Sequence, residues 1–188
     1  MSAPAGVSTV STARSLRAPG LFALACFTAH AVYHVARHET HDLLWTCNLA
    51  CLVVALSCLA NYRDGLAVGV SWLSVGIPLW LLDLGTGGEL VFTSALTHLG
   101  GYAAGLFAIR WLRWPPGVWW KATAAQLTLI LLTRLLTPPR ANVNLAFSVW
   151  PGWEKYFPTF GAYFFLLFAG SLVTYLAVDR TARRLLVQ

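Results

Sequence analysis

The chain has 188 residues, of which 57% are hydrophobic and only 11% are charged, and its mean hydropathy is +0.63. Soluble globular domains carry about 25% charged residues, so the composition excludes an ordinary soluble domain and indicates a membrane protein. The net charge is +6, and many of the basic residues lie beside apolar segments. Basic residues there set the orientation of a membrane protein, so we expect no nucleic-acid partner.

Residues 1–18 are small and polar without periodicity, so we expect a disordered tail there. Six apolar runs follow, each near the roughly 20 residues that cross a bilayer as a helix. They cover 20–36, 43–60, 66–84, 90–109, 118–137 and 158–178. The alternation of a transmembrane barrel is absent. The sequence therefore predicts an all-α protein, with one six-helix transmembrane domain over 19–180 and a basic tail over 181–188.

Six spans place both termini and the turns at 61–65 and 110–117 on one side of the membrane. That side carries Arg14, Arg17, Arg63, Arg110, Arg113, Arg180, Arg183 and Arg184. The other side has fewer basic residues, among them Arg37, Arg140 and Lys155. Because basic loops stay in the cytoplasm, we expect both termini there, in a multi-pass protein of the inner (cytoplasmic) membrane.

Histidines recur every four residues in and just after the first span, at His30, His34 and His38, a spacing that would place them on one stripe of a helix. This pattern raises two metal hypotheses, a haem between His30 or His34 and His98, and a zinc site of His34, His38 and Asp83. Histidines near a helix end are often only solvated. Our main expectation is therefore a protein without a metal or other cofactor, with the helix-one histidines as the alternative ligands.

Polar residues also gather in the outer half of the predicted bundle. Thr46, Cys47 and Asn48 begin the second span, and His98 stands alone in an apolar run. An ionisable group inside a span indicates a site that faces the bundle interior. The four cysteines, Cys26, Cys47, Cys51 and Cys58, lie within spans and not in loops, so we interpret them as free thiols.

Three segments together resemble a known group of proteins. They are LLWTCNLACL (43–52), THLGGYAAGLFAI (97–109) and TPPRANVNLAFSVWPGW (137–153). This combination resembles the bacterial six-helix integral membrane proteins of the YwaF-like family. Those proteins are related to a eukaryotic cysteine-dependent phospholipid acyltransferase and, more distantly, to the androgen-induced-gene lipid-ester hydrolases. The resemblance covers roughly residues 20–178.

The resemblance implies a nucleophile on the second span paired with His98. The acyltransferase relatives use a cysteine, which corresponds best to Cys47 with Cys51 as the rival, whereas the hydrolase relatives use a threonine, which favours Thr46. A nearby imidazole would deprotonate such a thiol and return the proton to the leaving group. Asp83 is the residue that we expect to orient His98.

Further residues are expected to bind the substrate. Asn48, Asn142 and Asn144 are candidate donors to an oxyanion. Arg134, together with Arg37, is a candidate for binding a lipid phosphate. The family usually has a tyrosine after the first asparagine of the NVN segment, where this chain has Val143.

The leading hypothesis is a membrane enzyme that acts on lipid acyl esters, by acyl transfer or hydrolysis, with membrane lipid as its partner. One alternative is a non-catalytic membrane subunit or interaction protein, and another is a haem- or metal-binding membrane protein. The sequence predicts neither the acyl chain nor the oligomeric state.

Overall fold

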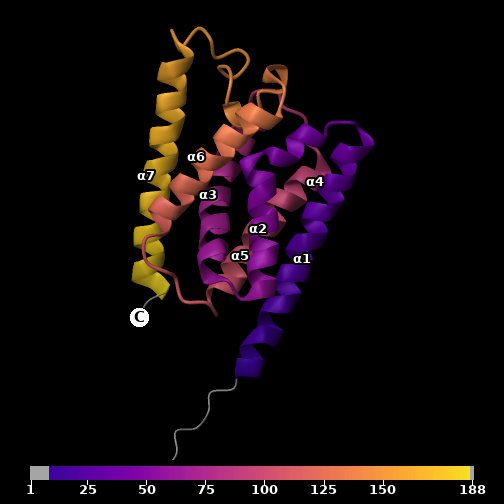
Figure 1. The fold of residues 1–188 in the computed structure, drawn as a ribbon, viewed down its shortest axis with the longest axis vertical. Helices are drawn as coiled ribbons and strands as arrows, with labels where there is room; N and C mark the ends of the chain where they lie inside the picture. The colour runs from indigo at the N-terminus through magenta and orange to yellow at the C-terminus, as the bar shows by residue number, and fades with distance from the viewer. Residues whose placement is uncertain (1–8, 187–188) are drawn as a thin grey trace, which may run out of the picture.

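The computed structural model describes residues 9–186, and the protein is 78% helix with no strands in that range (Figure 1). The prediction of an all-α fold is confirmed. In chain order the elements are α1 (Thr9–Ala36), η1 (Thr40–Leu44), α2 (Thr46–Ala60), α3 (Arg63–Gly85), α4 (Phe92–Ala95), η2 (Leu96–Gly100), α5 (Gly101–Ile109), α6 (Val118–Leu136), η3 (Pro139–Ala141), η4 (Val143–Leu145) and α7 (Phe160–Leu186).

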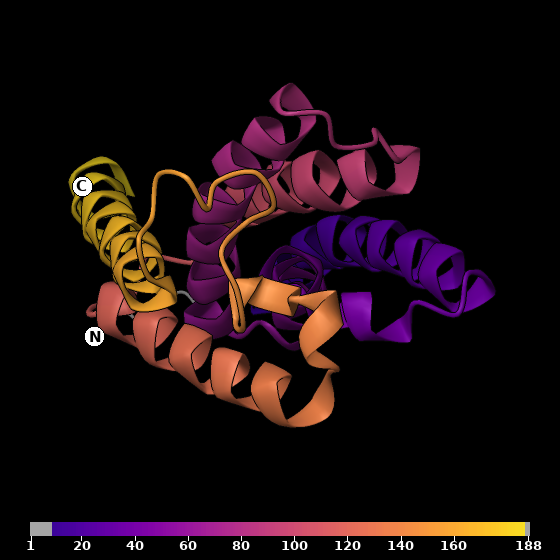
Figure 2. The ribbon, with the colours of Figure 1, turned by 90° about the horizontal axis from the view of Figure 1, so that it is seen from above.

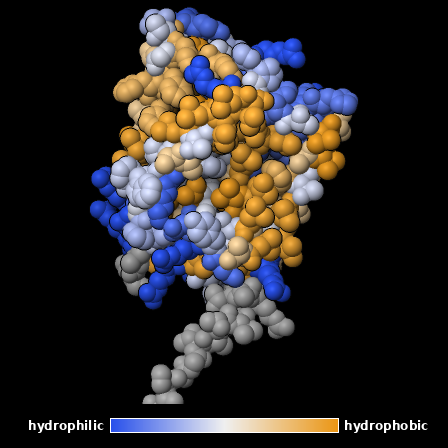
Figure 3. Space-filling view, in the orientation of Figure 1, coloured by the Kyte–Doolittle hydropathy of each residue, from blue (hydrophilic) through white to orange (hydrophobic). Residues whose placement is uncertain are grey.

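Three helices are long and apolar enough to cross a membrane: the Leu16–Ala36 part of α1, the whole of α3 and the whole of α7. Large apolar side chains such as Leu135 (80% exposed) and Phe165 (73% exposed) point outward from the helices. Figure 3 shows a broad apolar area across the middle of one face, with polar residues toward its two ends. These features are compatible with a membrane protein, because a soluble monomer rarely exposes so much contiguous apolar surface.

Helix α1 begins at Thr9, which corrects the expectation of a disordered tail for residues 9–18, whereas residues 1–8 lie outside the described part of the chain. From Leu16 onward the physical reason is burial. Leu16 is 0% exposed and belongs to the apolar core, and such packing stabilises a helix more than local propensity does.

Helix α7 likewise continues to Leu186, through most of the segment expected to be a basic tail. Arg183 donates two hydrogen bonds to the carboxylate of Asp179, four residues earlier, at 3.2 and 2.7 Å. Ion pairs at this spacing stabilise a helix, so the last turns form although they are polar.

The predicted helix over 90–109 is not one regular helix. It consists of α4, η2 and α5, and η2 is π-helical, with the Gly101 N–H bonded to the Leu96 carbonyl five residues earlier. Such wide turns are rare and frequently occur at functional sites. His98 lies in the middle of this one.

Helix α3 is the centre of the packing. It contacts α2 and α5 on one side and α6 and α7 on the other, as the view from above shows (Figure 2). Glycines allow the closest approaches: a Cβ at Gly69 would lie 2.8 Å from Val54 Cγ2 and 3.0 Å from the Ala50 carbonyl oxygen of α2. The space left between these two groups of helices contains the candidate site.

Candidate functional site

A cavity of about 320 Å³ lies within the bundle and is lined from both helix groups. Its polar lining comprises His30, His34, Asp42, Thr46, Cys47, Asn48, Asp83, Glu89, Ser94, His98, Gln126, Asn144 and Ser171. Its apolar lining includes Trp72, Val75, Leu79 and Ile130 of α3 and α6, and Phe164, Leu167 and Phe168 of α7. The cavity therefore offers polar chemistry beside an apolar wall of a kind that suits a hydrocarbon chain.

His98 is held in this cavity by contacts with Ser94 and Trp80. Its Nδ1–H donates to the Ser94 carbonyl oxygen at 2.9 Å, and its ring stacks on Trp80 with centroids 4.8 Å apart and planes 13° from parallel. A neutral imidazole with a proton on Nδ1 carries a lone pair on Nε2. The contacts thus fix both the tautomer and the plane of the ring, and they leave Nε2 free to accept a proton.

Cys47 is the cysteine that lines the cavity. The four thiols are free, as predicted, and the other three are buried in helix contacts. A Cβ at Gly20 would lie 2.9 Å from Cys58 Cβ, one at Gly100 would lie 2.9 Å from Cys26 Sγ, and one at Gly101 would lie 2.8 Å from Cys51 Sγ. Cys51 also donates its thiol hydrogen to the Ala23 carbonyl oxygen at 3.3 Å. Of the two predicted cysteine nucleophiles, only Cys47 borders the cavity.

Thr46 and Asn144 line the cavity but are bonded to each other. Asn144 Oδ1 accepts from the Thr46 backbone N–H at 2.6 Å and from the Thr46 hydroxyl at 2.8 Å. Asn144 Nδ2 donates to the Leu44 carbonyl oxygen at 2.8 Å and to the Thr133 hydroxyl at 2.9 Å. Both donors of Asn144 and the hydroxyl hydrogen of Thr46 are therefore occupied, and the group ties the 137–159 segment to α2 and α6.

Asn48 is 3% exposed, and its Nδ2 donates to the Asp42 carbonyl oxygen at 2.8 Å, while its Oδ1 is buried without a hydrogen-bond partner.

Asp83 lines the same cavity, but the group that orients the His98 ring is the Ser94 carbonyl and not the Asp83 carboxylate. The expected orienting role of Asp83 is corrected in this respect.

Two predicted substrate-binding residues lie outside the cavity lining. Arg134 is exposed, and its guanidinium lies over the Phe147 ring, 5.6 Å from the centroid. Asn142 folds its own loop, because its side chain bonds the backbone of Phe147 and Ser148. Among the residues that the structure describes, no lysine or arginine lines the cavity, whereas Asp42, Asp83 and Glu89 do.

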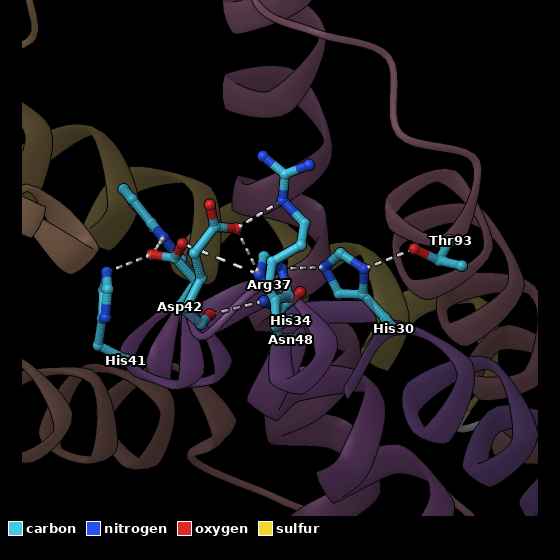
Figure 4. A network of polar contacts seen from close by, with 9 residues as sticks. His30, His34, Arg37, His41, Asp42, Asn48 and Thr93 are labelled. Carbon is cyan, nitrogen blue, oxygen red and sulfur yellow. Dashed lines mark hydrogen bonds and ion pairs between the residues drawn. The ribbon is translucent and has the colours of Figure 1, made fainter. Parts of the chain in front are cut away.

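The histidines of α1 take part in a polar network at the same end of the bundle (Figure 4). His30 Nδ1 lies 2.9 Å from the Thr93 hydroxyl, and its Nε2 lies 3.1 Å from His34 Nε2. His34 Nδ1 in turn faces the carboxylates of Glu39 and Asp42, at 3.6 and 3.8 Å. In this network the four-residue spacing brings His30 and His34 together.

Neither predicted set of metal ligands assembles. Within residues 9–186, the group whose ligand atoms converge is His34, Glu39 and Asp42, with all three atoms within 4.8 Å of one another. His38 is exposed and has φ of +59° where the chain leaves α1, so the helical stripe ends before it. The expectations built on His30, His34 and His38, and on His34, His38 and Asp83, are wrong about which of these side chains come together.

Arg37 lies beside this group. Its Nε donates to Glu39 Oε2 at 3.1 Å, and this hydrogen bond lowers the pKa of the Glu39 carboxyl below its usual range. The same bond, with the Glu39 charge, raises the pKa of the Arg37 guanidinium. Both groups are therefore charged at neutral pH.

Sequence reasoning missed Ser94, Trp80 and Glu39. The spacing of four predicts only the 3.4 Å contact between the Ser94 hydroxyl and His98 Nδ1, because the 2.9 Å acceptor is a backbone carbonyl that any residue at this position would supply. Trp80 had no such signal, since its stacking on His98 depends on how α3 packs against η2.

Comparisons with protein-family models, with curated proteins and with solved structures find no match for this chain. The resemblance to the YwaF-like family stays a prediction.

Proposed function

We propose that this chain is a six-span membrane protein with both termini in the cytoplasm, and that it acts on lipid acyl esters through Cys47 and His98. The distribution of arginines supports this orientation in a multi-pass protein of the inner membrane. The observation that carries it is the free Nε2 of an oriented His98 in the same cavity as Cys47.

The chemistry follows from the roles of these two groups. His98 Nε2 takes the proton of the Cys47 thiol, and the thiolate sulfur attacks the ester carbonyl carbon. The C–O bond of the ester breaks, the lipid alcohol leaves with the proton from His98, and a thioester remains on Cys47. Attack by water completes a hydrolysis, and attack by a second lipid hydroxyl completes an acyl transfer.

Cys47 is a better candidate than its rivals for a local reason. The hydroxyl hydrogen of Thr46 already binds Asn144, and the thiol hydrogen of Cys51 already binds the Ala23 carbonyl. A nucleophile must give its proton to the base, so a proton already donated elsewhere is a disadvantage. The apolar wall beside Cys47, with Phe164 and Phe168, supports an acyl chain as the group transferred.

The test is acyl labelling of the purified full chain with a phospholipid that carries an alkyne-tagged acyl chain. We expect a hydroxylamine-sensitive label on the wild type, none on Cys47→Ala, and about 100-fold slower labelling of His98→Gln, the usual scale for loss of a general base.

Cys51→Ala is the matched control, because it removes a thiol one turn away that does not line the cavity. It should label at the wild-type rate. Labelling of Cys47→Ala at the wild-type rate, in protein with an unchanged melting temperature, would refute the proposal, and loss of the label in Thr46→Val alone would move the nucleophile to Thr46.

A further inference from the structure

Two buried side-chain polar atoms in the described part of the chain have no hydrogen-bond partner, His34 Nδ1 and Asn48 Oδ1. Both belong to the network around Asp42, since Asn48 donates to the Asp42 carbonyl and His34 faces the Asp42 carboxylate (Figure 4). Buried polar groups are almost always paired, so an unpaired group indicates an ion or water that completes it.

The distances from His34 Nδ1 suit a shared metal better than direct hydrogen bonds. Nδ1 lies 3.6 Å from Glu39 Oε2 and 3.8 Å from Asp42 Oδ2, beyond the roughly 2.7–3.2 Å of an N–H···O bond. Two ligands held about 2.1 Å from a zinc ion in tetrahedral geometry are roughly 3.4 Å apart. The three ligand atoms lie within 4.8 Å of one another, so the carboxylates would have to rotate toward each other to share one ion.

The hydrogen bond of the other nitrogen permits His34 Nδ1 to act as a ligand in one of its two tautomers. His34 Nε2 and His30 Nε2 lie 3.1 Å apart, so one of them donates. If His34 donates, its Nδ1 carries a lone pair, and His30 donates its own Nδ1–H to the Thr93 hydroxyl at 2.9 Å. A ligand histidine is typically fixed by such a bond from its second nitrogen.

The carboxylates are also positioned. Trp45 Nε1–H donates to Asp42 Oδ1 at 3.2 Å, which leaves Oδ2 facing His34. His41 Nε2 lies 3.7 Å from the same Oδ1 and so stands behind the carboxylate. The basic group in contact with the ligand atoms is Arg37, which holds Glu39 Oε2 at 3.1 Å and would compete with a cation for it.

We propose that His34 Nδ1, Glu39 and Asp42 Oδ2 form a binding site for a divalent transition-metal ion of the Zn²⁺ type, with water in the remaining positions. An imidazole ligand favours such ions over Mg²⁺ and Ca²⁺, which prefer oxygen alone. The site joins the end of α1 to η1 at the cavity. It is independent of the proposed acyl chemistry, because no step of that chemistry uses the metal.

The experiment measures Zn²⁺ binding to the full chain, purified in detergent with an affinity tag that contains no histidine. We expect about one Zn²⁺ per chain by calorimetry and elemental analysis, and Co²⁺ should give a visible absorption band. His34→Gln and Asp42→Asn should each weaken Zn²⁺ binding by more than about 10-fold, because each removes one of three ligands. His41→Gln, in the same turn, should bind as the wild type does, and excess Mg²⁺ should not compete.

Weaker Zn²⁺ binding by the ligand variants could also come from misfolding, and Arg37→Gln tests for this. It frees Glu39 from its competing partner, so Zn²⁺ should bind several-fold more tightly, and misfolding cannot produce a gain. A protonated His34 that only pairs with the two carboxylates would bind no Zn²⁺, and that result would overturn the proposal. Equal losses in His34→Gln and His41→Gln would overturn it as well. Either result would leave acyl labelling at Cys47 unaffected.

Discussion

Asn144 shows at the scale of one residue how a side chain can organise the candidate site without taking part in its chemistry. Its amide makes four hydrogen bonds, two to Thr46, one to the Leu44 carbonyl and one to the Thr133 hydroxyl. Its φ of +55° lies in the left-handed region, which asparagine tolerates better than most residues. The residue therefore joins three elements through one amide.

Asn144→Ala should destabilise the protein by roughly 1–3 kcal/mol, because the Thr46 N–H and the Leu44 carbonyl would lose their partner. The measurement is thermal or denaturant unfolding in detergent. Asn142→Ala is the matched control, since Asn142 is also left-handed (φ of +44°) but bonds only its own loop. An equal effect of the two substitutions would show that backbone strain, and not the Asn144 bonds, is responsible.

At this scale the sequence predicted part of the site. The isolation of His98 in an apolar run and the position of Cys47 near the start of a span predicted residues that line one cavity. The sequence indicated Thr46 as a candidate nucleophile and Asn144 as a candidate oxyanion donor, and it did not predict the hydrogen bond between them. The two residues are 98 positions apart, and no local pattern reveals which side chains a fold brings together over such a distance.

At the scale of elements, the close packing of α2 against α3 depends on Gly69. A Cβ there would press on Val54 Cγ2 and on the backbone carbonyl of Ala50, and backbone cannot move aside as a side-chain end can. Small residues at such positions allow helices to approach closely in a membrane.

Gly69→Ala should therefore lower the free energy of unfolding by about 1–3 kcal/mol, the usual cost of overpacking. Gly170→Ala, in α7, is the control, since a Cβ there meets nothing within 4 Å and alanine favours helix. It should be neutral or stabilising. A Gly69→Ala protein that unfolds at the same temperature as Gly170→Ala would show that α2 and α3 are not closely packed.

The helices themselves were predictable from apolar runs, but their ends and interruptions were not. Apolar periodicity gave no reason to extend α1 back to Thr9, because the buried Leu16 gains its contacts only in the folded chain. The π-helical segment at His98 is also invisible to periodicity, since one widened turn shifts the pattern by a single residue.

At the scale of the whole molecule, the sign of the charge around the cavity bears on the substrate. Asp42, Asp83 and Glu89 line it, and no lysine or arginine of the described residues does. Arg134, the expected phosphate ligand, lies outside. An anionic headgroup would meet carboxylates of its own sign, which costs free energy at short range.

Turnover by the proposed enzyme, measured with a chelator present, should favour zwitterionic over anionic phospholipids in kcat/KM by several-fold. Asp83→Asn combined with Glu89→Gln should reduce this preference, because it removes two of the lining charges. Glu154→Gln, an exposed carboxylate outside the cavity lining, should leave it unchanged. A preference for anionic lipid in the wild type would contradict the electrostatic argument.

The difference in burial among the cysteines has a practical consequence for spectroscopy. All four cysteines face a glycine, Cys47 facing Gly76, but Cys26, Cys51 and Cys58 are buried, whereas Cys47 alone among the four is partly exposed and lines the cavity. A maleimide spin label or fluorophore applied to the folded wild-type chain would report from one position. Motions of the cavity wall can thus be followed without first constructing a cysteine-free background.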